Sequence, residues 1–264
     1  MALTAPAAAT ASQSPQPAQA LGADAVWAWW WPGSGELAAT VGDYGFERVY
    51  LYCEGGFDAK VKHAIAALRS RGIDVEALGG EPRWGTTQRK GLLEFVRSAR
   101  RYQRSAPPAM RLAGIHLDVE PYDLPAWDRD PGAVSRSLLA SMRSARRAAG
   151  PLPLSADIPY WYDRPLARAL IRATDATTIM AYRDSAPEIL DAARDEVEIA
   201  GRLGRKATVG VETDDVSPAS VTFFQEGTGA LVEAVGLIES DLAGEPGFGG
   251  VAVHHLESLQ RLVP

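Results

Sequence analysis

The chain has 264 residues, of which 46% are hydrophobic and 23% are charged, a composition typical of a globular protein with apolar material for one sizeable core. A formal net charge of -6 argues against a nucleic-acid partner, because phosphates select for clustered Lys and Arg. The sequence contains no run of about 18 apolar residues, so we expect no membrane-spanning helix and no membrane partner.

Residues 1–22 are rich in Ala, Pro, Ser and Gln and carry almost no large apolar side chain. They lack both the basic start and the apolar stretch of an intact secretory signal. We therefore expect a flexible tail or linker over residues 1–22, followed by a single domain over residues 23–264. For this domain we favour a monomer.

From Ala25 onward, a short β-branched or aromatic run, a polar turn and an amphipathic helix recur in that order. The predicted strands are Ala25–Trp30, Arg48–Cys53, Asp74–Leu78, Gly114–Glu120, Leu154–Ile158, Ala176–Tyr182, Ala207–Val211 and Gly250–His254. The predicted helices between them are Glu36–Val41, Asp58–Arg71, Gln88–Gln103, Gly132–Ala149, Pro165–Ala173, Ala186–Leu203 and Gly229–Ala243.

Strands that alternate with helices are typical of a parallel sheet built from βαβ units. Eight such units fit a closed (β/α)8 barrel, the TIM barrel of the α/β class, better than an open doubly wound sheet. The turn after the first strand, "WAWWWPGSG", also lacks the G-x-G-x-x-G spacing of a dinucleotide site. We predict a single TIM barrel with a flexible Ala/Pro-rich N-terminal tail and no cofactor.

Ionisable side chains stand at the C-terminal ends of seven predicted strands or in the loops that follow, where catalytic groups of TIM barrels lie. These residues are Glu54, Glu81, Asp118, Glu120, Asp157, Arg183, Asp184, Glu212, His254, His255 and Glu257. Acids scattered over helix surfaces would not converge in this way, so we expect one functional site at this rim.

The segment "AGIHLDVEPY", residues 113–122, places polar residues in an apolar strand. Residues two apart on a strand point to the same face, so His116, Asp118 and Glu120 share one side. The apolar residues between them must pack on the helices, and the polar set is therefore predicted to point into the barrel.

Two neighbouring carboxylates have a chemical use. Both cannot ionise easily, so one pKa rises and that group can donate a proton near neutral pH. Glu120, nearest the rim, is the candidate general acid, and Asp118 beneath it would hold and tune it; such a pair serves glycosidic bond cleavage. The alternative is a structural salt bridge inside the barrel, for which Arg183 is the main basic candidate in the sequence.

The same segment resembles the strand-four signature of the family 18 glycoside hydrolases, the chitinase-like TIM barrels, whose usual form is D-G-x-D-x-D-x-E. The resemblance implies that Glu120 is the general acid and that Asp118 supports it. The segment "TIMAYRD" is similar to the family's M-x-Y-D segment on strand six, which implies that Tyr182 contacts the reacting sugar. In that family the substrate's own N-acetyl group is the nucleophile.

The sequence departs from the family pattern at several positions, so it resembles a divergent member. Ala113 and His116 stand where two further aspartates are usual, and Arg183 directly follows Tyr182. His254 stands where chitinases usually carry a tryptophan.

A retaining glycosidase with two glutamates is the alternative enzyme mechanism. Glu120 would then be the acid/base at the end of strand four, and Glu212 the nucleophile at the end of strand seven. The chitinase-like interpretation is favoured over this one because Val119 replaces the Asn that commonly precedes such an acid.

Aromatic side chains at the rim suit a carbohydrate substrate, because sugar rings stack on Trp and Tyr. Trp84 and Trp161 lie in predicted loops, which favours ligand contact over core packing. The residues predicted to bind substrate are His116, Glu54, Glu81, Trp84, Tyr122, Asp157, Trp161, Arg183 and His254.

Two further classes remain open. A metal-dependent hydrolase could draw ligands from the acids and histidines at the rim, but the sequence has neither H-x-H on strand one nor H-E-x-x-H, so we predict no metal site. A non-catalytic carbohydrate-binding barrel is the alternative to an enzyme, since a fold does not guarantee its usual chemistry. The acid at Glu120 favours the enzyme.

Overall fold

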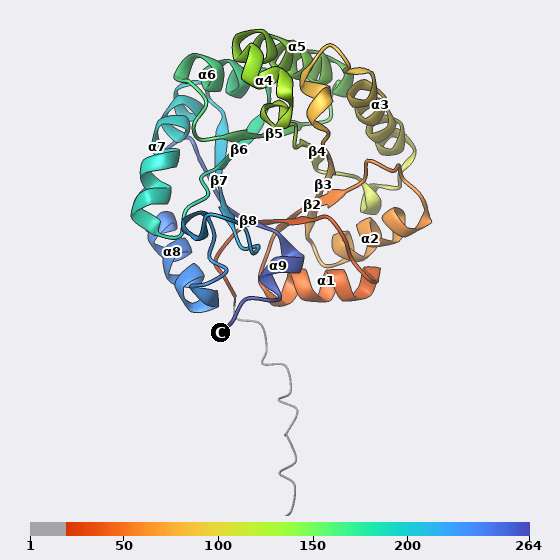
Figure 1. Cartoon of the computed structure of the whole chain (residues 1–264). Helices are drawn as coiled ribbons and strands as arrows, with labels where there is room; N and C mark the ends of the chain where they lie inside the picture. The colour runs from red at the N-terminus through yellow and green to blue at the C-terminus, as the bar shows by residue number, and fades with distance from the viewer. Residues whose placement is uncertain (1–19) are drawn as a thin grey trace, which may run out of the picture.

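The computed structural model describes residues 20–264, which form one closed eight-stranded barrel with helices around it (Figure 1). This confirms the predicted (β/α)8 architecture. The tail predicted for residues 1–22 lies almost wholly outside the described residues, and within it Leu21 is buried and donates its backbone N–H to the carbonyl of Tyr44.

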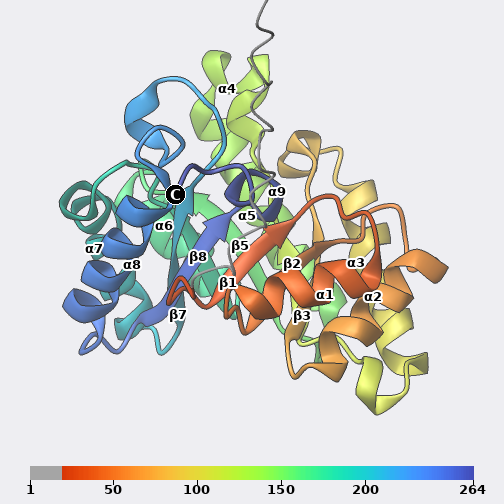
Figure 2. The same ribbon diagram turned by 90° about the horizontal axis from the view of Figure 1, so that it is seen from below.

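Each strand pairs in parallel with the next, and β8 returns to β1 to close the sheet. Seen from the side, the strands run in one direction, so that α4 and α9 lie at their C-terminal ends (Figure 2). The elements follow in the order β1 (Ala25–Ala28), α1 (Ser34–Asp43), β2 (Arg48–Tyr52), α2 (Ala59–Ser70), β3 (Asp74–Gly79), η1 (Pro82–Gly85), α3 (Lys90–Ser105), η2 (Pro108–Met110), β4 (Gly114–Leu117), η3 (Pro121–Asp123), α4 (Pro125–Arg129), α5 (Pro131–Ala149), β5 (Leu154–Pro159), α6 (Arg164–Ala173), β6 (Ala176–Met180), α7 (Ala186–Arg202), β7 (Lys206–Glu212), η4 (Ala219–Val221), α8 (Gly227–Leu242), β8 (Phe248–His254) and α9 (Leu256–Leu259).

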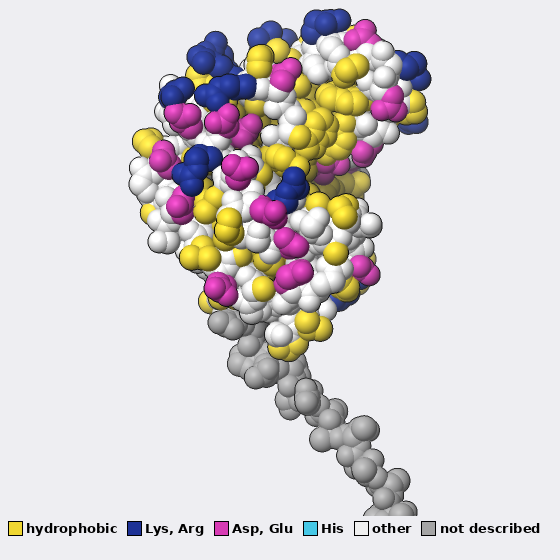
Figure 3. Space-filling view, turned by 60° about the vertical axis from the view of Figure 1, so that its left-hand side comes forward, with side chains coloured by type: hydrophobic (Ala, Val, Ile, Leu, Met, Phe, Trp, Pro, Cys, Tyr) yellow, Lys and Arg dark blue, Asp and Glu magenta, His cyan; other side chains and the backbone are white. Residues whose placement is uncertain are grey.

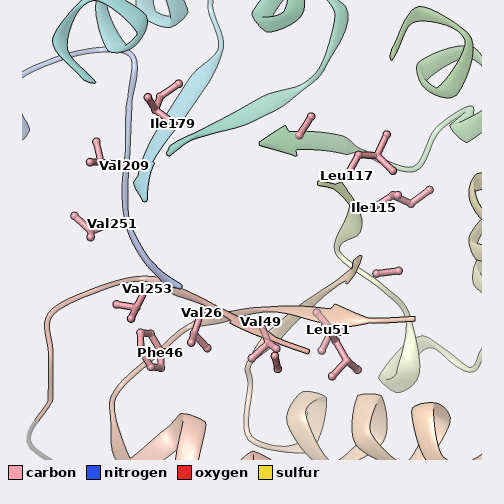
Figure 4. Close-up of a cluster of buried hydrophobic side chains, with 14 of the residues drawn as sticks. Val26, Phe46, Val49, Leu51, Ile115, Leu117, Ile179, Val209, Val251 and Val253 are labelled. Carbon is pink, nitrogen blue, oxygen red and sulfur yellow. The ribbon is translucent and has the colours of Figure 1, made fainter. Parts of the chain in front are cut away.

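The strands divide their side chains between two buried layers. Residues such as Val26, Val49 and Ile115 point outward and pack against the helices (Figure 4). The alternate positions fill the interior, where a smaller cluster contains Trp27, Tyr50 and Leu78. Because neighbouring side chains of a strand face opposite ways, the same alternation also brings His116 of β4 into the barrel.

Four strands end earlier than predicted, and short helices replace parts of the expected loops. β1 ends at Ala28, β2 at Tyr52, β4 at Leu117 and β6 at Met180, so Asp118, Glu120 and Tyr182 lie beyond the sheet. After β4 the chain turns into η3 at Pro121, because proline has no N–H with which to continue a ladder. Within residues 20–264, no helix is long and apolar enough to span a membrane.

Candidate active site

The loops after β3 and β4 pack directly on each other, and this packing places Asp118 at the mouth of the barrel. A side-chain carbon on Gly80 would lie 1.8 Å from the carbonyl oxygen of Asp118, so only glycine permits this approach. A side-chain carbon on Gly85 would likewise lie 2.7 Å from Cβ of Pro121. The N–H of Asp118 donates to the carbonyl of Gly79 at 3.2 Å, which fixes the backbone that carries the acids.

His116 points into the barrel, as predicted, but lies below the mouth with none of its surface exposed. Its ring stacks on Tyr50, with centroids 3.7 Å apart and planes 10° from parallel. Nε2 lies 2.8 Å from Oδ1 of Asp157, and Nδ1 lies 2.7 Å from Oγ of Ser155. The other oxygen of Asp157, Oδ2, accepts a hydrogen bond of 3.2 Å from Nε1 of Trp27.

The charge of His116 is balanced by two carboxylates. Burial acts to lower its pKa, but Asp157 and then Glu76 act in the opposite direction, and the pKa is raised to about 9. His116 is therefore an imidazolium at neutral pH, and both ring nitrogens donate. The hydroxyl of Ser155 in turn donates a hydrogen bond to Oε2 of Glu76. The other oxygen of Glu76, Oε1, lies 3.4 Å from Nε of Arg48.

This interior network corrects one expectation from the sequence. Arg183 is not the main basic partner of the buried carboxylates, since His116 and Arg48 take that place. Arg183 instead donates to the carbonyl of Tyr182 at 2.7 Å and contacts the hydroxyl of Tyr160, beneath whose ring its guanidinium also lies. Asp157 and His116 are too deeply buried for direct contact with a substrate, so any part they take acts through a neighbouring group.

Asp118 has no basic partner of this kind. Its Oδ1 atom is buried and has no hydrogen-bond partner among the described residues. Burial raises the pKa of Asp118 well above the usual range of an aspartate, and the nearby charges of Asp157 and Glu120 raise it further. The carboxyl of Asp118 is therefore a group that holds a proton where an exposed aspartate would not.

Glu120 is half-buried at the mouth and accepts a hydrogen bond from the hydroxyl of Tyr122. Burial raises the pKa of Glu120, the bond from Tyr122 lowers it, and the charges of Asp123 and Asp157 raise it again, so that the net shift is upward. A carboxyl with a raised pKa beside an open mouth can donate a proton to a bound molecule.

Tyr182 reaches the same group of acids from the loop after β6. Its ring stacks on His254, with centroids 5.9 Å apart. Burial, and after it the charges of Glu212 and Asp157, raises the pKa of Tyr182 well above its ordinary value. The hydroxyl therefore stays protonated and can donate a hydrogen bond.

Glu212 is held by three donors at the end of β7. Its Oε1 accepts the backbone N–H groups of Thr213 and Asp214 at 2.7 and 2.8 Å, and its Oε2 lies 2.8 Å from Nδ1 of His254. The indole N–H of Trp29 donates to Nε2 of His254 at 3.1 Å, so the proton of a neutral His254 lies on Nδ1 and points at Glu212. This geometry favours Glu212 as the anchor of His254 over Glu212 as a nucleophile, which needs a free oxygen.

An aromatic wall, defined by Tyr122, Trp127, Trp161 and Tyr162, stands beside Glu120. Trp161 packs edge-on against Tyr122 at 5.0 Å between centroids, while Trp127 stacks on Tyr162 at 5.6 Å. Trp161 is 46% exposed and so offers ring surface to solvent. The space-filling view shows hydrophobic side chains gathered in and around a hollowed region, with acidic side chains beside it (Figure 3).

Three other predicted substrate-binding residues follow β2 and β3. Glu54 is half-buried and accepts the N–H of Gly80 at 3.3 Å, and burial raises its pKa. Glu81 lies 3.8 Å from Arg83 in an ion pair. Trp84, predicted to lie in a loop, lies in η1, where it is buried and stacks on Phe95, so it does not offer an exposed ring to a ligand.

Several residues of the site gave no clear sign in the sequence. Glu76 is an acid within β3 that directly precedes the apolar residues at the end of the strand, and Ser155 is an ordinary residue of β5. Tyr162, whose buried hydroxyl has no partner in the described part of the chain, belongs to the run "YWY" after β5. Only the period-two spacing of Trp27 and Trp29 could have indicated two inward indoles.

Among the described residues, no group of three or more His, Cys, Asp or Glu side chains is arranged to hold a metal ion. The mouth instead combines two carboxyls with raised pKa values, a protonated tyrosine and an exposed aromatic surface. This combination can transfer a proton to a neutral ligand and hold an apolar ring face.

No protein-family model matches this sequence, and no curated protein is similar to it in sequence. Solved structures are similar in fold. A family 18 chitinase from Pseudoalteromonas aurantia aligns with a TM-score of 0.56 over 90% of this chain and 99% of its own, at 10% identity. A chitinase from Ipomoea carnea aligns with a TM-score of 0.54 over 90% of this chain and 96% of its own, at 16% identity.

A protein from Toxoplasma gondii assigned as a deoxyribose-phosphate aldolase aligns almost equally well, with a TM-score of 0.53 over 92% of this chain and 90% of its own, at 12% identity. At these identities the alignments establish a shared barrel and no activity. The resemblance to family 18 glycoside hydrolases that the sequence indicates therefore extends to the fold.

Proposed function

We propose that this protein is a glycoside hydrolase that cleaves a glycosidic bond with Glu120 as general acid and Asp118 as its supporting carboxyl. The observation that carries the proposal is the pair itself: two carboxyls, two residues apart at the mouth of a barrel, both with raised pKa values and neither paired with a base. A raised pKa on one of two neighbouring carboxyls is what protonation of a leaving sugar oxygen requires.

The surroundings of the pair support a sugar as the substrate. Trp161 presents an exposed indole next to Tyr122, the residue that contacts Glu120. Sugars bind to aromatic rings through their apolar faces and to polar groups through their hydroxyls. The fold neighbours include chitinases from two organisms, which fits this substrate class.

In the proposed reaction, the proton of Glu120 passes to the glycosidic oxygen as the bond from that oxygen to the anomeric carbon breaks. The carboxylate that remains on Glu120 and the neighbouring Asp118 carboxyl stabilise the positive charge that develops on the sugar ring. Tyr182 donates a hydrogen bond to the reacting sugar. Water completes the hydrolysis and Glu120 recovers a proton.

The attacking group distinguishes the two glycosidase mechanisms. Because the Oε1 lone pairs of Glu212 are taken by two backbone donors and its Oε2 lies against His254, we place Glu212 outside the covalent chemistry. Attack by an acetamido group of the substrate predicts cleavage of aryl N-acetylglucosaminides but not of aryl glucosides. Cleavage of both, with loss of both in Glu212→Ala, would instead support a nucleophilic Glu212.

The decisive test is Glu120→Gln, measured with a panel of aryl glycosides and with chito-oligosaccharides. We expect kcat to fall about 10²–10⁴-fold, because the proton donor is lost, while the dissociation constant of the oligosaccharide changes little. In the wild type, kcat should fall as the pH rises through the raised pKa of Glu120.

A matched control is Glu233→Gln, which removes an exposed carboxylate from α8. Absence of turnover in both wild type and Glu120→Gln, with oligosaccharide binding preserved, would leave a carbohydrate-binding barrel without catalysis, whereas equal measurable turnover in both would show that Glu120 is not the acid. A kcat that stays constant from about pH 5 to 9 would count against Glu120 as the acid.

A further inference from the structure

Both oxygens of Asp157 accept hydrogen bonds from buried side chains of other strands inside the barrel. His116 on β4 holds Oδ1 at 2.8 Å, and Trp27 on β1 holds Oδ2 at 3.2 Å. Both donors are buried, and the His116 ring is clamped by its stack on Tyr50. Asp157 therefore has one position and one set of partners.

The register that pairs Leu117 on β4 with Ala156 on β5 brings Asp118, the next residue, alongside Asp157, and Asp118 has no basic partner of its own. Its Oδ1 is buried without a partner in the described residues. The charged groups that face it are Asp157 on β5, His116 on its own strand, and Glu120 and Asp123 on the loop after β4. The negative charge of Asp157 acts on Asp118 more strongly than the positive charge of His116.

His116 faces two carboxylates, Asp157 on β5 and Glu76 on β3. Arg48 lies on the other side of Glu76, and the neutral ring of Tyr50 on β2 stacks on the His116 ring. A cation that touches two carboxylates cannot be removed without changing the charge that the mouth experiences.

We propose that His116 and Asp157 act as a positioning pair, in which His116 fixes the Asp157 charge beneath the mouth and this charge keeps the proton on Asp118 and Glu120. Neither residue touches the substrate; they set the protonation state of the two carboxyls that do. The rate measurements below rest on the proposed glycosidase function, whereas the spectroscopic one does not.

Two single variants should shift the basic limb of the pH profile of kcat, which is the fall of kcat at high pH, in opposite directions. His116→Gln keeps a donor to Asp157 but removes the positive charge, so the basic limb of the kcat profile should move to higher pH. Asp157→Asn removes the negative charge, so the limb should move to lower pH. We expect each shift to be about one pH unit, which is a tenfold change in proton affinity.

The double variant His116→Gln/Asp157→Asn replaces an ion pair by a neutral pair of similar shape. Because the wild-type pair and the double variant both have no net charge, the limb should return toward its wild-type position. If the two residues were only structural, the double variant should be less stable than either single variant, and the two single variants should not shift the basic limb of kcat in opposite directions. His63→Gln, which alters an exposed histidine on α2, is the control.

The same quantity can be measured without turnover. In protein labelled with ¹³C at the aspartate carboxyls, with Asp118→Asn to assign the signal, wild-type Asp118 should titrate far above pH 4, the usual range of an aspartate. Titration of Asp118 near pH 4 would overturn the proposal even if no variant folds. Absence of any glycosidase activity, together with an Asp118 titration that is high in the wild type and lower in Asp157→Asn, would overturn the proposed function and leave the positioning pair supported, whereas an Asp118 titration unchanged in Asp157→Asn would overturn the pair.

Discussion

Three carboxyl groups at the mouth belong to the same chemical class and differ in what each one touches. Glu212 is held by two backbone N–H groups and His254, whereas the Glu120 carboxyl accepts a hydrogen bond from the hydroxyl of Tyr122. Asp118 leaves one oxygen without a partner. Hydrogen-bond donors favour the charged form of an acid, and their absence favours the neutral form. The contacts therefore indicate that Glu212 anchors His254, whereas Asp118 and Glu120 are the groups that can carry a proton.

Trp161 is the residue of the aromatic wall that a sugar can reach. Replacing it by Ala should raise KM for an oligosaccharide about tenfold, because one aromatic stack contributes roughly 1–1.5 kcal/mol, and should leave kcat within about a factor of two. Trp161→Phe, which keeps a ring, should lie between. Michaelis kinetics with chito-oligosaccharides measure both constants.

Leu237→Ala on α8 removes an equally exposed apolar side chain away from the mouth and serves as the control. If Trp161→Ala lowered kcat as strongly as Glu120→Gln while KM stayed constant, the indole would be acting on the chemistry through Tyr122 and not as a platform.

At the residue scale, the alternation of "GIHLDVE" was enough to predict that His116, Asp118 and Glu120 face the interior, because a strand can bury only one face against the helices. It could not reveal that His116 pairs with Asp157. That contact depends on the register between β4 and β5, which sets His116 opposite Ser155 and brings Asp157 within reach. Sequence distance carries no information of this kind.

At the element scale, the closeness of the β3 and β4 loops depends on glycines, and Gly80 makes the tightest approach. Gly80→Ala would place a carbon 1.8 Å from the carbonyl oxygen of Asp118, so the loop that carries both acids must move. We expect a loss of about 3 kcal/mol in the free energy of unfolding and a large fall in kcat, since overpacking against backbone cannot be relieved by a rotamer change. Urea unfolding and aryl glycoside hydrolysis measure the two effects.

The matched change is Gly229→Ala in α8, where an added carbon meets nothing within 4 Å. It should stabilise the protein by about 0.5–1 kcal/mol, because alanine favours a helix over glycine. A neutral Gly80→Ala would show that Asp118 is not placed by this contact.

Element ends were harder to predict than the elements themselves. The apolar runs gave all eight strands, but they could not show that β4 stops at Leu117, because its last polar residues continue the alternation. The short helices α4 and α9 have only 5 and 4 residues, too few to show a helical period. α4 follows soon after Asp118 and Glu120 and carries Trp127 of the aromatic wall, so part of the candidate site lies on a helix that the sequence did not predict.

For the whole molecule, closure of the sheet is what unites the site. Trp27 on β1, His116 on β4 and Asp157 on β5 meet only because the barrel folds back on itself, and the mouth acids stand above this buried network. The network is also a source of stability that depends on pH, since His116 changes its charge between the folded and unfolded chain.

The pKa of His116 is about 9 in the folded protein and about 6.5 in an unfolded chain. A group with a raised folded pKa contributes stability that is complete below its unfolded pKa, so the free energy of unfolding should be highest at or below about pH 6.5 and should fall as the pH rises to about 9. The loss attributable to His116 has an upper limit of about 3 kcal/mol. Guanidinium unfolding, followed by tryptophan fluorescence at several pH values from 6 to 9.5, measures it. His116→Gln should remove most of the change in the free energy of unfolding between pH 6.5 and 9, and His63→Gln should not. A wild-type free energy of unfolding that is already constant over this interval would show that His116 does not keep its proton in the folded protein.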